Sequence, residues 1–251
     1  NRMGFNNPGA AEVRDRLIDR RASGKWPKTP VAANIGRSKK TPNESAASDY
    51  SQTLDMLWNH ADMFVLNISS PNTPGLRDLA DSDYLSSIVT ECKSMAERKG
   101  GGKPLLVKVS PDARNEEILS SAHSALRSGA DGLVAINTSM HRPVPRNATS
   151  RGVFAQAGGI SGRPLQNRSK EVISLLYSEV GDSIPIVGVG GIESTDTAWD
   201  AITSGASLIQ LYSALVFKGP SVVSSIVRGL KKKVKQNGFV GLDEAVGYEI
   251  P

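Results

Sequence analysis

The sequence has a single cysteine, Cys92, among its 251 residues. An internal disulfide and a cysteine-based zinc site are therefore excluded, and a reducing compartment is compatible with this composition. Apolar residues surround the cysteine at the spacing of one helix face: Ile88, Val89, Met95 and Ala96. The pattern predicts that Cys92 is a small buried core residue rather than a nucleophile.

Histidines and long apolar runs are scarce as well. The three histidines, His60, His123 and His141, lie far apart and lack the spacing of metal ligands, so we expect no metal site. No apolar run approaches the roughly 18 residues of a membrane-spanning helix, and no signal peptide is visible.

Aromatic residues make up only 5% of the chain, and they do not alternate with basic residues. A stacking surface for single-stranded nucleic acid is therefore not predicted. The formal net charge is +5, but the one dense basic run, Lys231, Lys232, Lys233 and Lys235, falls in a predicted C-terminal helix. A solvated helix face explains such a run better than a binding site, so we expect no nucleic-acid partner.

The chain does contain a regular alternation of strand and helix patterns. A short amphipathic helix with Val13, Leu17 and Ile18 on its apolar face comes first. Six apolar segments predict buried strands at residues 31–35, 63–68, 105–109, 132–136, 184–189 and 208–211. Helical patterns follow at residues 44–58, 83–98, 115–128, 169–180, 195–204 and 221–236. Such alternation predicts an α/β protein with a parallel sheet, either doubly wound or closed as a barrel.

Polar residues or glycines stand at the end of every predicted strand. In a barrel these ends share one rim, where such folds build active sites, whereas an open sheet gathers only a few of them. The pairs are Asn34 and Gly36, Asn67 and Ser70, Lys108 and Ser110, Asn137 and Thr138, Gly190 and Gly191, and Tyr212 and Ser213. This recurrence favours a (β/α)8 TIM barrel, of which the chain supplies about six βα units in one domain, residues 1–251. We expect the first quarter of the barrel to be absent, which would expose strand edges and an apolar interior.

Residues 64–76 join the second predicted strand to a rigid polar loop. The apolar run at its start is typical of a strand covered on both faces. Five polar residues crowd the strand end, among two prolines and a glycine: Asn67, Ser69, Ser70, Asn72 and Thr73. Residues of these types can simply end a strand. Their place beside the other polar strand ends favours a binding site.

Residues 186–191, Ile-Val-Gly-Val-Gly-Gly, follow the fifth strand pattern. The third glycine of a dinucleotide fingerprint is missing, and no acidic residue ends the next strand, so that interpretation fails. A phosphate site fits better, because glycines let the backbone approach an anion and Ser194 or Thr195 can cap the next helix, whose N-terminal amides attract an anion. Tyr212 and Ser213 end the following strand, where barrels often hold a phosphate. A glycine turn without a ligand is the alternative.

Lys108 projects from an apolar strand, where an unpaired ammonium is costly. Three roles remain open for it. It is a Schiff-base lysine of an aldolase-like barrel, a cation beside the electron-rich part of a flavin, or a member of a structural ion pair.

Seven motifs in order tie these residues together. They are Asn-Arg-Met-Gly-Phe-Asn from Asn1, Ala-Asn-Ile-Gly around Asn34, Asn-Ile-Ser-Ser-Pro-Asn-Thr-Pro-Gly-Leu-Arg from Asn67, Leu-Val-Lys-Val-Ser-Pro-Asp from Leu106, Gly-Gly-Ile-Ser-Gly-Arg-Pro-Leu from Gly158, Ile-Val-Gly-Val-Gly-Gly-Ile from Ile186 and Leu-Ile-Gln-Leu-Tyr-Ser from Leu208. With them the chain resembles the dihydroorotate dehydrogenase family, specifically its quinone-linked, membrane-associated class, over essentially its entire length.

The resemblance implies an FMN-containing enzyme that oxidises dihydroorotate to orotate in pyrimidine (UMP) synthesis and passes the electrons to a membrane quinone. It implies that Ser70 is the catalytic base, with Lys108 beside the flavin. The implied cofactor-binding residues are Asn34, Asn67, Lys108, Gly162, Gly190, Gly191, Tyr212 and Ser213. The implied substrate-binding residues are Asn1, Arg2, Met3, Gly4, Phe5, Asn67, Asn72, Asn137 and Thr138. Residues 140–165 would include the loop that covers the substrate.

The chain departs from the family pattern at Ile136, where Thr or Ser usually precedes the substrate-binding asparagine. The resemblance also implies that the membrane-associating N-terminal segment is absent here. That segment would hold the protein peripherally on the cytoplasmic face of a bacterial inner membrane, or alternatively on the mitochondrial inner membrane. Ser70, where soluble members carry cysteine, favours the quinone-linked class. A lyase or aldolase using Lys108, and a truncated non-catalytic flavin- or phosphate-binding relative, remain the alternatives.

Overall fold

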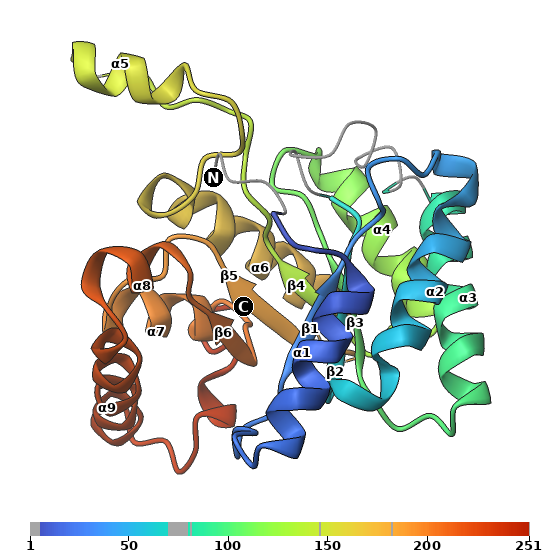
Figure 1. Cartoon of the computed structure of the whole chain (residues 1–251). Coiled ribbons are helices and arrows are strands. Elements are labelled where there is room, and N and C mark those ends of the chain that lie inside the picture. The colour runs from blue at the N-terminus through green and yellow to red at the C-terminus, as the bar shows by residue number, and fades with distance from the viewer. Residues whose placement is uncertain (1–5, 70–79, 81, 146, 182, 251) are drawn as a thin grey trace.

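The computed structural model describes residues 6–69, 80, 82–145, 147–181 and 183–250, arranged as Figure 1 shows. Within these residues, six parallel strands form one sheet whose spatial order repeats the chain order. The strands are β1 (Ala32–Ile35), β2 (Met63–Asn67), β3 (Leu105–Lys108), β4 (Gly132–Ala135), β5 (Ile186–Val189) and β6 (Leu208–Gln210). Each lies inside its predicted segment, so the predicted α/β fold with six βα units is confirmed.

The helices connect the strands as crossovers. Those predicted from sequence are α1 (Ala10–Ala22), α2 (Ala46–Leu57), α3 (Ser82–Arg98), α4 (Asn115–Arg127), α6 (Gln166–Val180), α7 (Thr195–Thr203) and α9 (Ser221–Gln236). Consecutive helices pack against each other from α1 to α4, then α4 on α6, α6 on α7 and α7 on α9, so they follow the curl of the sheet. Two short helices were not predicted, α5 (Ala148–Phe154) and α8 (Ser213–Lys218).

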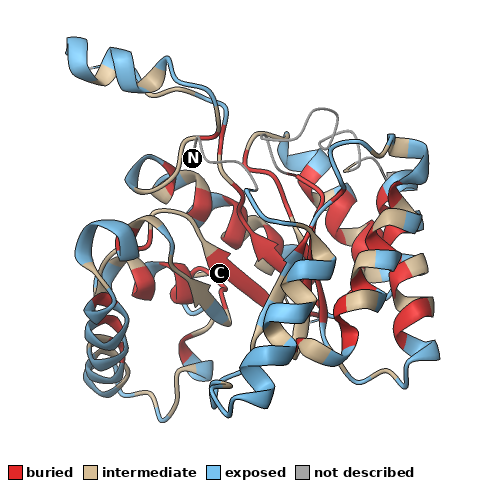
Figure 2. Cartoon of the chain, in the orientation of Figure 1, coloured by how far each residue is buried: buried red, intermediate tan, exposed pale blue. Residues whose placement is uncertain are grey.

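Apolar side chains cover both faces of the sheet. Phe64 and Leu66 of β2 belong to the large core between the sheet and the helices, and Cys92 of α3 is fully buried there, as predicted. Burial raises the pKa of the Cys92 thiol to about 12. Figure 2 shows this division, with buried strands in the centre and helices that expose their outer faces.

The inner face of the curled sheet holds a separate apolar layer of Val65, Leu106, Val134 and Val187, each at most 4% exposed. The predicted exposure of the interior is therefore wrong for the four central strands, because the curl packs one inward residue of each strand against the next. At the edge the prediction holds. Leu208 of β6, paired in register with Val187, is 60% exposed.

Two aspartates fix the ends of strands opposite the polar rim. The Asp62 carboxylate accepts a hydrogen bond from the backbone N–H of Val31 at 2.7 Å, and Asp131 accepts one from Leu105 at 2.8 Å. In each case an acidic residue before one strand binds the start of the preceding strand. These contacts hold the register that aligns the polar strand ends on the other side.

The connection from β4 to α6 leaves the body of the protein. Ser139 and Ile160 form an antiparallel bridge at its base, and Figure 1 shows α5 projecting away from the sheet. Asp112 holds this base by accepting hydrogen bonds from the Ser139 hydroxyl and, at 2.7 Å, from the backbone N–H of Met140. Both ends of the connection lie at the strand ends, residues 136–138 before the bridge and residues 161–165 after it.

Two other features of the described residues bear on the predictions. No group of three or more His, Cys, Asp or Glu side chains there is arranged to hold a metal ion, and none of the helices there is long and apolar enough to span a membrane. On α9, Lys231, Lys232 and Lys235 are exposed and Lys233 binds Asp196 at 2.9 Å, as expected for a solvated face.

Candidate functional site

The carboxyl ends of the strands surround a cavity of about 920 Å³. Ten residues predicted from the sequence line it: Asn34, Asn67, Lys108, Asn137, Thr138, Gly162, Gly190, Gly191, Tyr212 and Ser213. The other predicted site residues, Ser70, Asn72 and the segment Asn1, Arg2, Met3, Gly4 and Phe5, lie outside the described residues. Every predicted site residue that the structure describes is therefore at one cavity, and the roles assigned to them remain predictions.

Two asparagines, one at the end of β2 and one two residues after β4, meet in this cavity. The Asn137 Nδ2 donates to Asn67 Oδ1 at 2.9 Å and to Ser69 Oγ at 3.2 Å, while Asn137 Oδ1 accepts from the backbone N–H of Thr138 at 2.9 Å. The Ser69 hydroxyl donates a hydrogen bond to the backbone carbonyl of Lys108 at 2.7 Å. This network sets both amide orientations, and no acceptor for Asn67 Nδ2 is found among the described residues, so its N–H groups can serve a ligand.

Lys108 ends β3 and lines the cavity. Burial lowers the pKa of its ammonium to about 8. Among the described residues, no carboxylate lies within ion-pair distance of its Nζ, so the structural ion pair weighed from the sequence is not formed there. A half-buried cation that has no carboxylate partner among the described residues fits a ligand that carries electron-rich or negatively charged atoms.

Ile136 and Thr138, which follow β4, present different chemical groups to the cavity. Ile136 is 2% exposed and gives the cavity an apolar wall where a hydroxyl was expected. The Thr138 hydroxyl is buried and has no hydrogen-bond partner among the described residues. Such a group is costly unless a ligand or water satisfies it.

Glycines from the loops after β4 and β5 form another part of the cavity wall. Gly162 and Gly191 have φ values of 79° and 71°, which favour glycine. A Cβ on Gly191 would lie 2.5 Å from Gln166 Cγ and 2.8 Å from the Gly162 carbonyl oxygen. Gln166 Nε2 also donates to the Gly191 carbonyl at 2.8 Å. The loops after β4 and β5 therefore contact each other so closely at Gly191 that a larger side chain would not fit between them.

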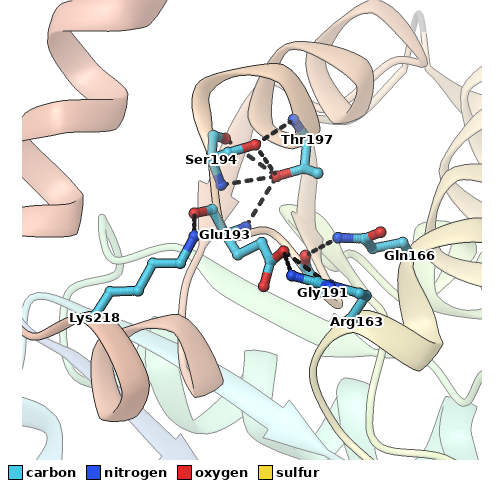
Figure 3. Close-up of polar contacts among 7 residues, drawn as sticks. All are labelled: Arg163, Gln166, Gly191, Glu193, Ser194, Thr197 and Lys218. Carbon is cyan, nitrogen blue, oxygen red and sulfur yellow. Dashed lines mark hydrogen bonds and ion pairs between the residues drawn. The ribbon is translucent and has the colours of Figure 1, made fainter.

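The start of α7 is capped, as Figure 3 shows. Ser194 Oγ accepts from the backbone N–H of Thr197, and Thr197 Oγ1 accepts from the backbone N–H groups of Glu193 and Ser194 at 2.9 and 3.0 Å. Ser194 is thus the cap, not Thr195. Of these three amides only that of Thr197 belongs to α7 itself, so the expected anion site at this helix start stays a prediction.

Several cavity residues were not predicted. They are Ser161, Arg163, Pro164, Leu165, Val189, Ile192, Glu193, Gln210, Leu211, Ala214, Phe217 and Lys218, besides Ile136. Arg163 could have been found from its position, because it directly follows Gly162 in its motif. Ser161 is held by Ser213, whose Oγ lies 3.1 Å from its own. This contact joins the loop after β4 to the strand end of β6.

A sequence model of the family described as dihydroorotate dehydrogenase matches residues 1–234. The chain belongs to the dihydroorotate dehydrogenase family. Two relatives named dihydroorotate dehydrogenase (quinone) come from Trichodesmium erythraeum, 44% identical over 98% of this chain, and Nautilia profundicola, 41% identical over 100%. The chain spans 65% and 66% of their lengths, about two thirds of each.

Solved structures of the family show the same fold. The dihydroorotate dehydrogenase of Eimeria tenella in complex with ferulenol matches 99% of this chain with a TM-score of 0.88 and 32% identity, and the chain covers 71% of it. The ligand-free form of the same enzyme matches with a TM-score of 0.89 and 33% identity, and the chain covers 73% of it. The predicted barrel class and the family resemblance are both confirmed.

Proposed function

We propose that this chain forms the larger part of the active site of a quinone-linked dihydroorotate dehydrogenase. The reaction is oxidation of dihydroorotate to orotate in pyrimidine (UMP) synthesis, with FMN as hydride acceptor and a quinone as final electron acceptor. One observation carries the proposal: a single cavity brings together the hydrogen-bonded amides of Asn67 and Asn137, the Lys108 ammonium and the glycine loops after β4 and β5. The family assignment supports this reaction over a Schiff-base lyase.

The residues of the cavity fit a flavin mononucleotide. Its volume of about 920 Å³ lies in the range of ligand pockets. Asn34, Asn67 and Lys108 would hold the ring, and Gly162, Gly190, Gly191, Tyr212 and Ser213 would hold the ribityl phosphate end. A bound FMN would supply the acceptor for the hydride that leaves carbon 6 of dihydroorotate.

The polar groups at the other part of the cavity fit a flat ring with several carbonyl and amide edges. Asn67 offers N–H donors, and the buried Thr138 hydroxyl is free to turn toward a ligand atom. Asn137 orients Asn67 and would also contact the ring. Asn72 and residues 1–5 are proposed to complete this part, with the Gly4-Phe5 backbone beside the ring.

Ser70 is proposed to take the proton from carbon 5 of the substrate. It directly follows Ser69, whose hydroxyl is fixed between Asn137 and the Lys108 carbonyl, so the chain leading to Ser70 is anchored at the site. Serine is a weak base at its ordinary pKa, so the proton transfer needs a site that stabilises the deprotonated oxygen or a water that relays the proton. Below pH 8 the Lys108 ammonium contributes positive charge to the same cavity.

The proposed partners are dihydroorotate, orotate and a membrane quinone. Relatives with quinone in their names come from bacteria, which favours peripheral association with the cytoplasmic face of a bacterial inner membrane.

The test is an assay of the full-length protein, purified without added flavin. We expect a yellow protein that reduces a quinone analogue when given dihydroorotate. Ser70→Ala should abolish flavin reduction and preserve flavin binding, whereas Ser224→Ala, on exposed α9, should change neither. A colourless protein without this activity would reject the proposal, and borohydride trapping of a carbonyl substrate on Lys108 would favour the lyase instead.

A further inference from the structure

Three charged side chains gather at the glycine end of the cavity. Arg163 follows Gly162, Glu193 lies two residues after Gly191, and Lys218 ends α8; all three line the cavity. Figure 3 shows them reaching toward one another from three different loops or helix ends. None was assigned a role in the reaction proposed above.

Glu193 is the centre of this cluster. The Arg163 guanidinium donates to Glu193 Oε1 through Nε at 3.0 Å and through Nη2. Lys218 instead donates to the Glu193 backbone carbonyl, at 2.9 Å. The Glu193 side chain is 25% exposed and that of Arg163 is 73% exposed, so the carboxylate lies inward and the guanidinium covers it from the solvent side.

A carboxylate in this position opposes the ligand proposed for it. A phosphate monoester carries between one and a half and two negative charges near neutral pH, so a bare carboxylate lining the same end would repel it. A flavin without the phosphate would not feel this repulsion. Pairing with Arg163 removes the net charge of Glu193 and leaves Lys218 as an uncompensated cation of this cluster.

We propose that Arg163, by neutralising Glu193, determines the preference of this cavity for a phosphorylated flavin over an unphosphorylated one. The inference rests on the proposed FMN site and adds a specificity-determining pair to it. Arg163 acts through Glu193 rather than as a catalytic residue.

The backbone of this region does not depend on the pair. Thr197 Oγ1 holds the Glu193 N–H, Lys218 holds the Glu193 carbonyl, and Gln166 holds the neighbouring Gly191. An ion pair as exposed as this one adds little to folding stability. Substitutions of the two side chains should therefore change charge at the cavity while the loops stay in place.

The experiment measures FMN and riboflavin dissociation constants by fluorescence titration of the flavin-stripped, full-length protein. Arg163→Met should weaken FMN binding about tenfold, equivalent to about 1.4 kcal/mol. Riboflavin binding should not change. Glu193→Gln should leave FMN binding as tight as in the wild type or tighter, and the double variant should regain the affinity of Glu193→Gln. Raising the salt concentration should reduce the defect of Arg163→Met.

Two further variants serve as controls. Arg114→Met breaks a pair with Glu117 at the start of α4, in which the arginine is about as exposed as Arg163, and should affect neither flavin. Arg163→Lys keeps the positive charge and should retain most of the FMN preference. Together with unchanged riboflavin binding, this result would show that the defect of Arg163→Met comes from lost charge and not from misfolding.

Several results would overturn the inference. Equal weakening of both flavins by Arg163→Met means a structural role, and unchanged FMN binding means no role. A double variant as weak as Arg163→Met means that Arg163 contacts the phosphate directly instead of masking Glu193. Wild-type protein that binds neither flavin would overturn both this inference and the proposed function, whereas the first three results leave the proposed function standing.

Discussion

The phenolic oxygen of Tyr50 donates a hydrogen bond to the backbone carbonyl of Asn67, at 2.8 Å. Tyr50 belongs to α2 and is fully buried, and burial raises its pKa far above the ordinary value. A helix on the outer face of the sheet therefore fixes the strand end from which Asn67 meets Asn137 and from which the chain leads to Ser70.

Tyr50→Phe should lower the free energy of unfolding by about 1–2 kcal/mol, because the buried Asn67 carbonyl loses its partner. It should also raise the KM for dihydroorotate, since Asn67 loses a constraint on its position. Urea denaturation and steady-state kinetics measure the two effects. Tyr84→Phe, on the exposed side of α3, is the matched control and should change neither.

Asn137→Asp replaces a donor by an acceptor that faces Asn67 Oδ1 across 2.9 Å. The two oxygens repel each other, so the amide donors of Asn67 should turn away from the substrate. We expect kcat/KM for dihydroorotate to fall about a hundredfold, the usual loss for one misplaced donor in an active site. Asn167→Asp, exposed on α6, should retain full activity. Unchanged turnover of Asn137→Asp would show that the Asn67–Asn137 amide pair has no role in the reaction.

Lys108→Met should make the protein more stable and inactive. Burial lowers the pKa of Lys108 from 10.5 to about 8, so the unfolded chain binds a proton that the folded protein does not hold between these pH values. Stability of the wild type therefore rises as pH increases from about 8 to about 10.5. At pH 7 the variant should gain about 2 kcal/mol, and this gain should shrink above pH 8.

Urea denaturation of wild-type and Lys108→Met protein at pH 7 and pH 10 tests whether the stability difference shrinks as pH rises. Lys231→Met, on the exposed face of α9, provides the surface control. A gain that is independent of pH would show that packing, rather than the buried charge, is responsible.

Gly191→Ala should reduce FMN affinity at least tenfold. The added methyl would lie 2.5 Å from Gln166 Cγ and 2.8 Å from the Gly162 carbonyl, which forces the two loops apart. Gly238→Ala has a similar φ of 77° but meets open space, so it should cost only the backbone strain of about 1–2 kcal/mol. The difference between the two variants, measured by fluorescence titration and thermal unfolding, isolates the close approach of the loops.

Ile136→Thr restores the hydroxyl that the family resemblance leads one to expect at this cavity wall. FMN binding should tighten about threefold to tenfold, the worth of one hydrogen bond, while stability falls by about 1–2 kcal/mol from the lost apolar burial. Ile136→Val removes the same methylene without adding a hydroxyl. It should lose stability and gain no affinity, and equal affinity for the two variants would mean that the hydroxyl finds no partner.

The fold was readable from sequence because the four central strands, β2 to β5, are buried on both faces. In β2, Phe64 faces the helices and Val65 the inner layer, so the run is apolar throughout and separates clearly from the helical patterns. Helix α8 was missed because its six residues are too few to show a period. Its apolar run, residues 214–217, also begins only three residues after the end of the predicted strand, so it does not stand out as a separate element.

The site was readable only in part. Asn67 and Lys108 stand out because they are polar residues in apolar strands, where burial needs a reason. Arg163 and Glu193 do not stand out, because charged residues on loops are ordinarily solvated. The bond between Asn67 and Asn137 joins residues 70 positions apart, so only the register of β2, β3 and β4 brings it about.

The order of strands in the sheet, which repeats the chain order from β1 to β6, also bears on how the protein is made. As the chain leaves the ribosome, each new strand finds its neighbour already synthesised, and no strand has to insert between two that are already paired. The sheet can therefore grow by one βα unit at a time. Asn67 would be in position early, but its hydrogen bond with Asn137 could form only after two more strands had been translated.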